Sequence, residues 1–96
     1  MFIVLLTYVA ELSEVEKHLA DHLAYLDRCY AQGVFIASGP KVPRTGGLIL
    51  AVSPTRDALE VILADDPFIQ QGIAQYEMTE FVPRKTAPLF EVLIGA

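Results

Sequence analysis

The chain has 96 residues, with twelve acidic side chains against seven Lys and Arg, for a formal net charge of −5. This length fits one domain, because domains of about 100–150 residues are the commonest size. The acidic balance argues against a nucleic-acid partner, whose phosphates demand basic surface. Hydrophobic residues make up 53% of the chain and the mean hydropathy is +0.41, a surplus that suggests burial of some surface against a second chain.

The apolar surplus is distributed along the chain, which argues against a membrane segment. The longest apolar runs, Phe2–Leu6 and Leu48–Val52, are far shorter than the ~20 residues that span a bilayer. No basic segment precedes the first apolar run, so no signal peptide is expected. The single cysteine, Cys29, cannot form an internal disulfide, and we expect a protein of the reducing cytoplasm.

The first half of the chain predicts a strand and then a long helix. Residues 1–9 are β-branched and aromatic, and apolar on both parities, which is typical of a strand covered on both faces. Ser13 followed by Glu16 has the spacing of a capping box. Apolar residues then recur at helical spacing, and Gly33 is a suitable stop. We therefore expect one continuous helix from Ser13 to about Gly33.

A second, short strand is predicted over Val34–Ser38, and Gly39-Pro40 ends it. The connection from Gly39 to Gly46 contains two prolines and is long for a hairpin. Long loops in compact domains are more often functional than accidental. A third strand, again apolar on both parities, is predicted over Gly47–Val52.

The second half of the chain predicts a helix, an edge strand and a tail. Ser53 as cap, with Pro54 at the first helical position, predicts a helix that runs to about Asp65. Pro67 ends it and pushes Asp66 out of the helical region. Residues 73–82 alternate loosely and mix polar with apolar side chains, as an edge strand should. Residues 84–96 form a C-terminal tail with an apolar stretch at 89–94.

The predicted order is βαββαβ plus the tail, in one domain over residues 1–96. Right-handed crossovers turn this order into an α+β, ferredoxin-like antiparallel sheet with the first and third strands in the centre. Two helices can cover only one face of that sheet, so we expect a second copy to cover the other face in a homodimer. The tail could dock on this partner, and assembly beyond the dimer is left open.

Three short motifs carry a family resemblance in their order and spacing. They are His22-Leu23-Ala24-Tyr25-Leu26, then Gly39-Pro40 with Gly46-Gly47-Leu48-Ile49-Leu50, then Asp66-Pro67-Phe68. With these motifs the chain resembles the YciI-like, or YCII-related, family of small proteins. The resemblance implies a dimeric α/β barrel. It also implies that His22 and Asp66 are the candidate catalytic residues, because a histidine and an aspartate at these places are the residues proposed as catalytic in the family.

The residues themselves support a pairing of His22 with Asp66. His22 shares a helical stripe with Leu19 and Leu26, which points it toward the sheet. Asp66 lies on the same side of the sheet in the predicted topology. A carboxylate near an imidazole fixes its tautomer and favours its protonated form, and such a pair can act as general base and then general acid. A structural interpretation stays open, with His22 a satisfied core histidine and Asp66 part of a helix-end turn.

Three further residues are candidate substrate contacts. Ser38 could donate a hydrogen bond, and Gly39 would let a ligand approach the backbone; in the family this Gly-Pro segment borders the pocket. Arg44, in the following loop, is the cation placed to meet an anionic substrate. The alternatives stay open that Ser38 and Gly39 form a plain turn after the strand and that Arg44 is solvated. Many relatives carry an arginine three residues before the histidine, where this chain has Leu19, so this protein uses another cation or prefers a different substrate. The tyrosines are expected mostly in the core or an interface, and Tyr8, late on a central strand, is the one to check for facing a pocket.

Metal and thiol chemistry are the weaker alternatives. His18 and His22 are four residues apart, a spacing that can bind zinc, but no third ligand motif accompanies them. Cys29 lies on the apolar stripe with no histidine partner in sequence reach, which indicates a buried structural thiol. We expect neither a metal nor a cofactor.

Two functions of different class follow from these observations. The first is a cofactor-free enzyme, a lyase or isomerase, that moves protons on a small cyclic or aromatic molecule with His22 as acid/base and Asp66 as its orienter. The resemblance favours it, because one member of the family resembles a dehydrochlorinase of chlorinated hydroxyquinols. The second is a non-catalytic module whose pocket senses or holds a metabolite. An enzyme requires His22 and Asp66 within hydrogen-bond reach, in a pocket that admits a ligand.

Overall fold

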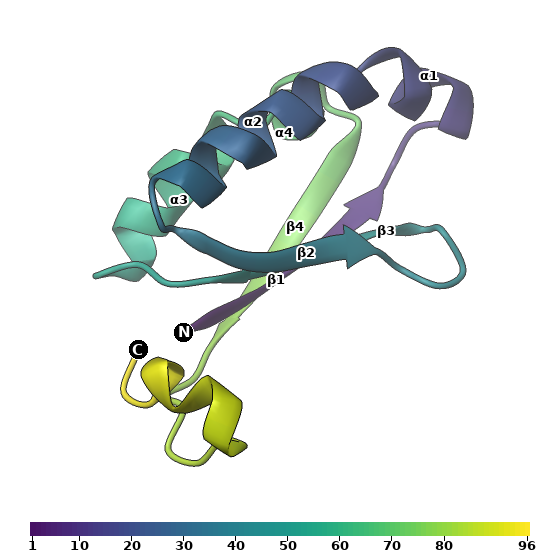
Figure 1. Cartoon of the computed structure of the whole chain (residues 1–96). Helices are drawn as coiled ribbons and strands as arrows, with labels where there is room; N and C mark the ends of the chain where they lie inside the picture. Colours follow the sequence, from purple (N-terminus) through teal and green to yellow (C-terminus); the bar gives the residue numbers. More distant parts are fainter.

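The computed structural model describes all 96 residues and places helices on one face of a four-stranded antiparallel sheet (Figure 1). The strands are β1 (Phe2–Tyr8), β2 (Phe35–Pro40), β3 (Gly46–Ala51) and β4 (Ala74–Glu80). They lie in the order β2-β3-β1-β4, and every neighbouring pair is antiparallel. The predicted ferredoxin-like fold is confirmed, with the first and third strands in the centre.

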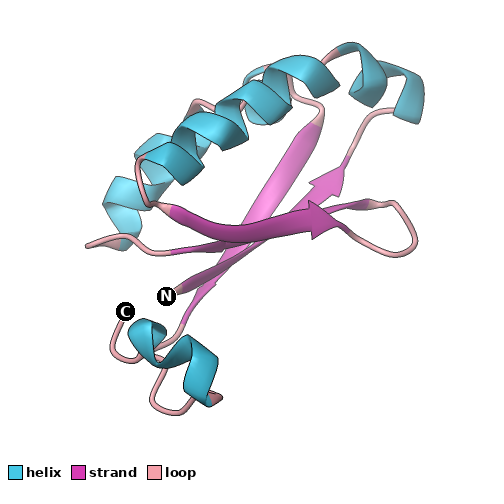
Figure 2. Ribbon diagram, viewed as in Figure 1, coloured by secondary structure: helices cyan, strands magenta, loops and turns pink.

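The helices are α1 (Leu12–Lys17), α2 (Leu19–Ala31), α3 (Arg56–Ala64) and α4 (Pro67–Gln70). All four lie on the same side of the sheet (Figure 2). The prediction of one continuous first helix is wrong at His18, whose backbone (φ −111°, ψ 5°) leaves the helical region and separates α1 from α2. Gly33 follows α2 with a positive φ of 74°, a conformation that glycine adopts without strain.

The start of α1 also differs from the predicted capping box. Glu11 is the N-cap residue, and no side chain caps this helix. Ser13 lies inside the first turn, and Glu16 is turned toward Arg44, at 2.6 Å from Glu16 Oε1 to Arg44 Nη1. Glu16, whose carboxylate the capping-box pattern assigned to the N-terminus of this helix, therefore makes a tertiary contact instead.

The helix after β3 begins later than predicted. Thr55, rather than Ser53, is the N-cap of α3, and its side chain accepts a hydrogen bond from the Ala58 N–H at 3.1 Å. Pro67 occupies the start of α4 instead of only ending the helix before it. Proline suits that position because the missing N–H would have no helical partner there. Asp66, the N-cap of α4, is extended as predicted (φ −63°, ψ 123°).

The core lies between the sheet and the helices. On β1, Phe2 and Val4 are fully buried under the helices, while the alternate residues Ile3 and Leu5 face the other side and are only partly buried. Leu59 of α3 is fully buried against the same layer. Burying one such side chain contributes about 1.5–3 kcal/mol relative to leaving it exposed.

The second face of the sheet has no helix over it (Figure 1). The 3₁₀ helix η1 (Pro88–Leu93) lies away from the other helices, near Met1, whose amine donates a hydrogen bond to the Ala96 carbonyl at 2.7 Å. The apolar side chains of η1 point outward, with Leu89 83% and Val92 87% exposed. In the whole chain, no helix combines the length and the apolar character that crossing a membrane requires.

Candidate active site

His22 on α2 and Asp66 at the start of α4 form a buried pair. Nδ1 of His22 lies 2.8 Å from Oδ1 of Asp66, and the two side chains are 12% and 0% exposed. Oδ1 also accepts the backbone N–H of Phe68 at 2.9 Å, so this oxygen acts as an acceptor and Nδ1 is the donor. Nε2 of His22, which has no protein partner, is then the acceptor nitrogen of the neutral ring.

The Asp66-Pro67-Phe68 turn holds the imidazole from two directions. Pro67 keeps Asp66 extended, which aims the carboxylate at the edge of the His22 ring. The Phe68 ring stacks on the imidazole, with centroids 4.0 Å apart and planes 7° apart. Tyr8 in turn contacts Phe68 edge-on, at 5.9 Å and 89°. The orientation of His22 is therefore fixed by the protein itself.

The Asp66 end of this pair is deeply buried. Asp66 Oδ2 is buried without a hydrogen-bond partner, so the pairing of the carboxylate rests on one oxygen. Burial raises the pKa of the Tyr25 hydroxyl, which donates a hydrogen bond to the Ile62 carbonyl at 2.7 Å. Burial also raises the pKa of the Cys29 thiol. Cys29 is thus buried, as predicted, and its thiolate is disfavoured.

The pair borders a cavity of about 470 Å³. Apolar side chains, glycines and a few polar groups line it, contributed by α1, α2, α4, three strands and the β2–β3 loop: Leu6, Tyr8, Glu16, Leu19, His22, Leu23, Leu26, Ser38, Gly39, Pro40, Arg44, Gly46, Gly47, Leu48, Ile49 and Phe68. Four of the five predicted site residues are in this lining, namely His22, Ser38, Gly39 and Arg44. Asp66 is not, because it lies behind the imidazole that it orients.

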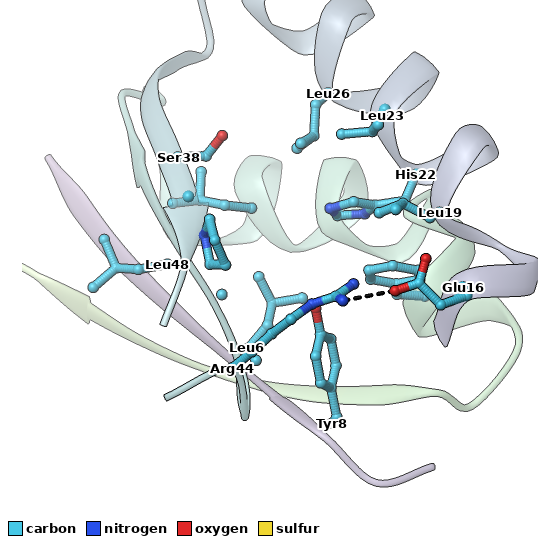
Figure 3. Close-up of a pocket in the computed structure, with 16 residues that line it drawn as sticks. Leu6, Tyr8, Glu16, Leu19, His22, Leu23, Leu26, Ser38, Arg44 and Leu48 are labelled. Atoms are coloured by element: carbon cyan, nitrogen blue, oxygen red, sulfur yellow. Dashed lines mark hydrogen bonds and ion pairs between the residues drawn. The ribbon is translucent and has the colours of Figure 1, made fainter. Parts of the chain in front are cut away.

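The candidate binding residues differ in their contacts. Ser38 lies on the outer strand β2, and its Oγ is 2.5 Å from the hydroxyl of Tyr30 on α2. Gly39 has open space where a Cβ would lie, so a ligand can approach the backbone there. Arg44 reaches from the β2–β3 loop to Glu16 on α1 (Figure 3). The structure brings all three to the cavity, and their part in binding stays a prediction.

Glu16 is the charged cavity residue that the sequence did not reveal. Its position three residues after Ser13 matched a capping box, and nothing local links it to Arg44, 28 residues away. Tyr8, the tyrosine to check for facing a pocket, is in the cavity lining and lies beside the Arg44 guanidinium (Figure 3). The hydrogen bond with Glu16 raises the pKa of Arg44.

Close backbone packing at the floor of the cavity explains why residues 46 and 47 are both glycine. A Cβ on Gly46 would lie 1.8 Å from the Leu6 carbonyl oxygen, which no side chain can do without moving a strand. A Cβ on Gly47 would lie 3.2 Å from the Gly39 carbonyl oxygen. Glycine at these positions therefore allows β3 to run close to both of its neighbours.

The alternative of a zinc site rested on the four-residue spacing of His18 and His22 alone. His18 is the residue at which the predicted first helix breaks. No group of three or more His, Cys, Asp or Glu side chains is placed to hold a metal ion.

Fold and site together define a ferredoxin-like α+β domain with an apolar pocket and a buried His-Asp pair in its wall. The sequence matches the model of the YCII-related domain over residues 1–82. The chain therefore belongs to the YCII-related family, as its motifs predicted, and the tail lies outside the matched region.

The comparison with solved structures agrees on the fold. One similar structure is that of the 5-chloro-2-hydroxyhydroquinone dehydrochlorinase from Burkholderia phenoliruptrix AC1100, in complex with 2,5-dihydroxybenzoquinone. The TM-score is 0.71 at 19% sequence identity, over 84% of this chain and 93% of that chain. At this identity the likeness concerns the fold. The comparison with curated proteins gave no match.

Proposed function

We propose that this protein is a cofactor-free enzyme that moves protons on a small cyclic or aromatic molecule, as a lyase or isomerase. The observation that carries the proposal is the His22–Asp66 pair, with Nδ1 bound to a fully buried carboxylate and the ring at the wall of a cavity. A histidine held in this way can accept a proton at Nε2 and return it. We place the enzyme in the reducing cytoplasm, which its single free cysteine suits.

In the proposed reaction, His22 is the acid/base and Asp66 its positioning residue. The neutral imidazole takes a hydroxyl proton from a bound enol or phenol at Nε2, and the buried carboxylate stabilises the positive charge that develops on the ring. The imidazolium then returns this proton to a ring carbon, which gives the keto tautomer. If that carbon carries chlorine, chloride leaves with its bonding electrons as the imidazole, neutral again, takes the proton of a second hydroxyl. The net loss is HCl, and no added oxidant is needed.

The similar dehydrochlorinase suggests the size and class of the ligand. Its structure holds 2,5-dihydroxybenzoquinone, a molecule with one six-membered ring. The cavity of about 470 Å³ can admit such a molecule, since ligand pockets commonly measure about 300–1,000 Å³. Leu23 and Leu26 would pack on the ring, while Ser38, the Gly39 backbone and Arg44 would bind its polar substituents.

The test of this chemistry follows turnover and the state of His22 in the same samples. The protein is incubated with 5-chloro-2-hydroxyhydroquinone, and released chloride and quinone absorbance are measured. We expect His22→Asn to slow turnover by about 10²–10⁴-fold, the usual contribution of general acid/base catalysis. Asp66→Asn should slow it as well, and ¹⁵N NMR should show that the Nδ1–H tautomer of His22, present in the wild type, is no longer dominant.

A matched control is available next to Asp66. Asp65 is exposed at the end of α3, so Asp65→Asn changes the same charge without touching His22 and should leave turnover unchanged. A wild-type protein that binds ring compounds in the cavity but converts none of a panel of cyclic acids and phenols would contradict the enzyme. It would instead favour the second function, a non-catalytic module that holds or senses a metabolite.

We further propose that two copies pair through the open face of the sheet. On that face Ile3 lies opposite Leu50 and Leu5 lies opposite Leu48, and no helix covers them (Figure 1). Apolar side chains gathered in this way favour contact with a second sheet. The exposed apolar side chains of η1 would extend the contact, with the tail docked on the partner.

Sedimentation equilibrium tests this assembly. We expect the mass of a dimer or a multiple of it for the wild type and a monomer for Leu5→Glu, which places a charge at the centre of the proposed contact. A monomeric wild type would contradict the proposal. Deletion of the tail after Pro83 should weaken the dimer if the tail docks on the partner, and an unchanged dissociation constant would contradict that docking.

A further inference from the structure

The mouth of the cavity carries a charged pair that the proposed proton transfer does not use. Arg44 comes from the β2–β3 loop and Glu16 from α1, and Nη1 donates to Oε1 at 2.6 Å. These are the only two side chains in the lining that carry a full charge independent of His22. Of these two side chains, Arg44 is the one whose charge can match that of an anionic ligand.

Glu16 does not use all the hydrogen-bonding capacity of Arg44. A guanidinium has five N–H donors in one plane, and only Nη1 is engaged with Glu16. The Tyr8 hydroxyl lies beside the guanidinium, on the cavity side (Figure 3). A planar cation next to a hydroxyl suits a planar acid group, which can accept two parallel hydrogen bonds from the guanidinium.

The contact between Glu16 and Arg44 is open to water. The two side chains are 52% and 39% exposed, and an exposed ion pair adds little stability because water competes for both charges. An acid group inside the cavity would meet the same guanidinium in a pocket whose lining includes the apolar side chains of Leu19 and Leu26. Charge-assisted hydrogen bonds are stronger in such a setting. A ligand acid is therefore the better partner for Arg44, and Glu16 is the one it displaces.

We propose that Arg44 and Tyr8 form an anion subsite at the mouth of the cavity, and that the Glu16 carboxylate occupies it until a ligand binds. The ligand is then a ring that carries an ionised oxygen acid, a carboxylate or an acidic enol, directed at Arg44 while another part of the ring faces His22. Neutral rings of the same shape leave the ion pair intact and bind more weakly. This rests on the proposed function only in requiring that the cavity binds ring compounds, and it does not require proton transfer.

Benzoate and benzamide test the proposal, because they share ring and size and differ in charge. Both are titrated into the wild type, Arg44→Gln and Glu16→Gln at low salt and neutral pH, and binding is followed by the NMR signals of the cavity residues. We expect the wild type to prefer benzoate by about 10-fold, the usual effect of one charge-assisted contact. Arg44→Gln should lose that preference. Glu16→Gln should bind benzoate more tightly than the wild type and benzamide equally well.

Two variants control for net charge. Arg84→Gln in the tail and Glu14→Gln on α1 remove the same charges outside the cavity lining, so they should leave both affinities unchanged. Equal binding of the two probes by the wild type, a Glu16→Gln variant that gains nothing, or no binding of either probe would overturn the subsite. The proposed enzyme fails on different readouts, turnover and the tautomer of His22, so the two failures are distinguishable.

Discussion

Two pairs of a basic and an acidic side chain lie at the cavity, His22 with Asp66 and Arg44 with Glu16, and the protein holds them in different ways. His22 and Asp66 are almost fully buried, and the imidazole is fixed by a carboxylate at its edge and by a phenyl ring on its face. Glu16 and Arg44 are both exposed, although their contact is the shorter of the two, 2.6 Å against 2.8 Å. Burial rather than distance therefore separates their roles. A fixed pair suits repeated proton transfer, and an exchangeable pair suits recognition at an entrance.

The largest effect that separates the two regions is expected at the buried carboxylate. Asp66→Ala removes the N-cap of α4, worth about 0.5–2 kcal/mol, and leaves Nδ1–H of His22 without its acceptor, at about 1–3 kcal/mol. We expect a loss of about 1.5–5 kcal/mol in the free energy of unfolding, measured by urea denaturation. Asp65→Ala, at the neighbouring exposed carboxylate, should change stability by less than about 0.5 kcal/mol. Similar losses in both variants would mean that the buried pair is not a special feature of the wall.

The second effect compares the floor of the cavity with its rim. Gly46→Ala would place a Cβ 1.8 Å from the Leu6 carbonyl oxygen, so β1 and β3 must move apart, and we expect a loss of about 1–3 kcal/mol or more. Gly39→Ala at the rim meets nothing within 4 Å and should change stability little. Thermal unfolding of the two variants measures the difference, and a stable Gly46→Ala protein would contradict the tight approach of the two strands.

The sequence predicted the sheet well because its signals are local. The central strands are apolar on both parities, and this pattern persists whatever the helices above them do. The break at His18 left no such signal, since apolar residues keep their helical spacing across it. Pro67 was interpreted only as a helix stop, although proline is also favoured at a helix start. Ser53 and Thr55 are both acceptable caps, and only tertiary packing chooses between them.

One part of the site could also be predicted from the sequence and another could not. The motifs pointed to His22 and Asp66, and their contact followed from the topology, because both lie on the helix side of one small sheet. The pairing of Glu16 with Arg44 could not be predicted, because it depends on how α1 turns after the break at His18 and on where the β2–β3 loop lies. Burial and exposure, which distinguish the two pairs, are properties of the assembled layers rather than of any motif.

A third effect concerns Tyr25, a buried tyrosine that follows His22 by three residues on α2. Burial, and to a smaller extent the neighbouring Cys29, raises the pKa of Tyr25 above its ordinary value of 10.0. The unfolded chain therefore ionises at a lower pH than the folded one, so the contribution of Tyr25 to stability is complete below about pH 10 and is lost as the pH rises further. Urea unfolding at about pH 8 and about pH 11 should show this loss. In Tyr25→Phe the loss should be smaller, after an initial cost of about 1 kcal/mol for the missing hydrogen bond to Ile62.

The smallest effect is the sharpest test of the comparison, because it asks whether the mouth is as exchangeable as its exposure implies. Double-mutant cycles with Glu16→Gln and Arg44→Gln, and with His22→Asn and Asp66→Asn, measure the coupling within each pair. At 1 M salt the Debye length falls to about 3 Å, which screens exposed charges far more than buried ones. We expect the coupling between Glu16 and Arg44 to disappear and that between His22 and Asp66 to persist. A coupling between Glu16 and Arg44 that persists at 1 M salt would mean that this pair is held as firmly as the buried one. Glu16 could then not be the carboxylate that a ligand acid displaces.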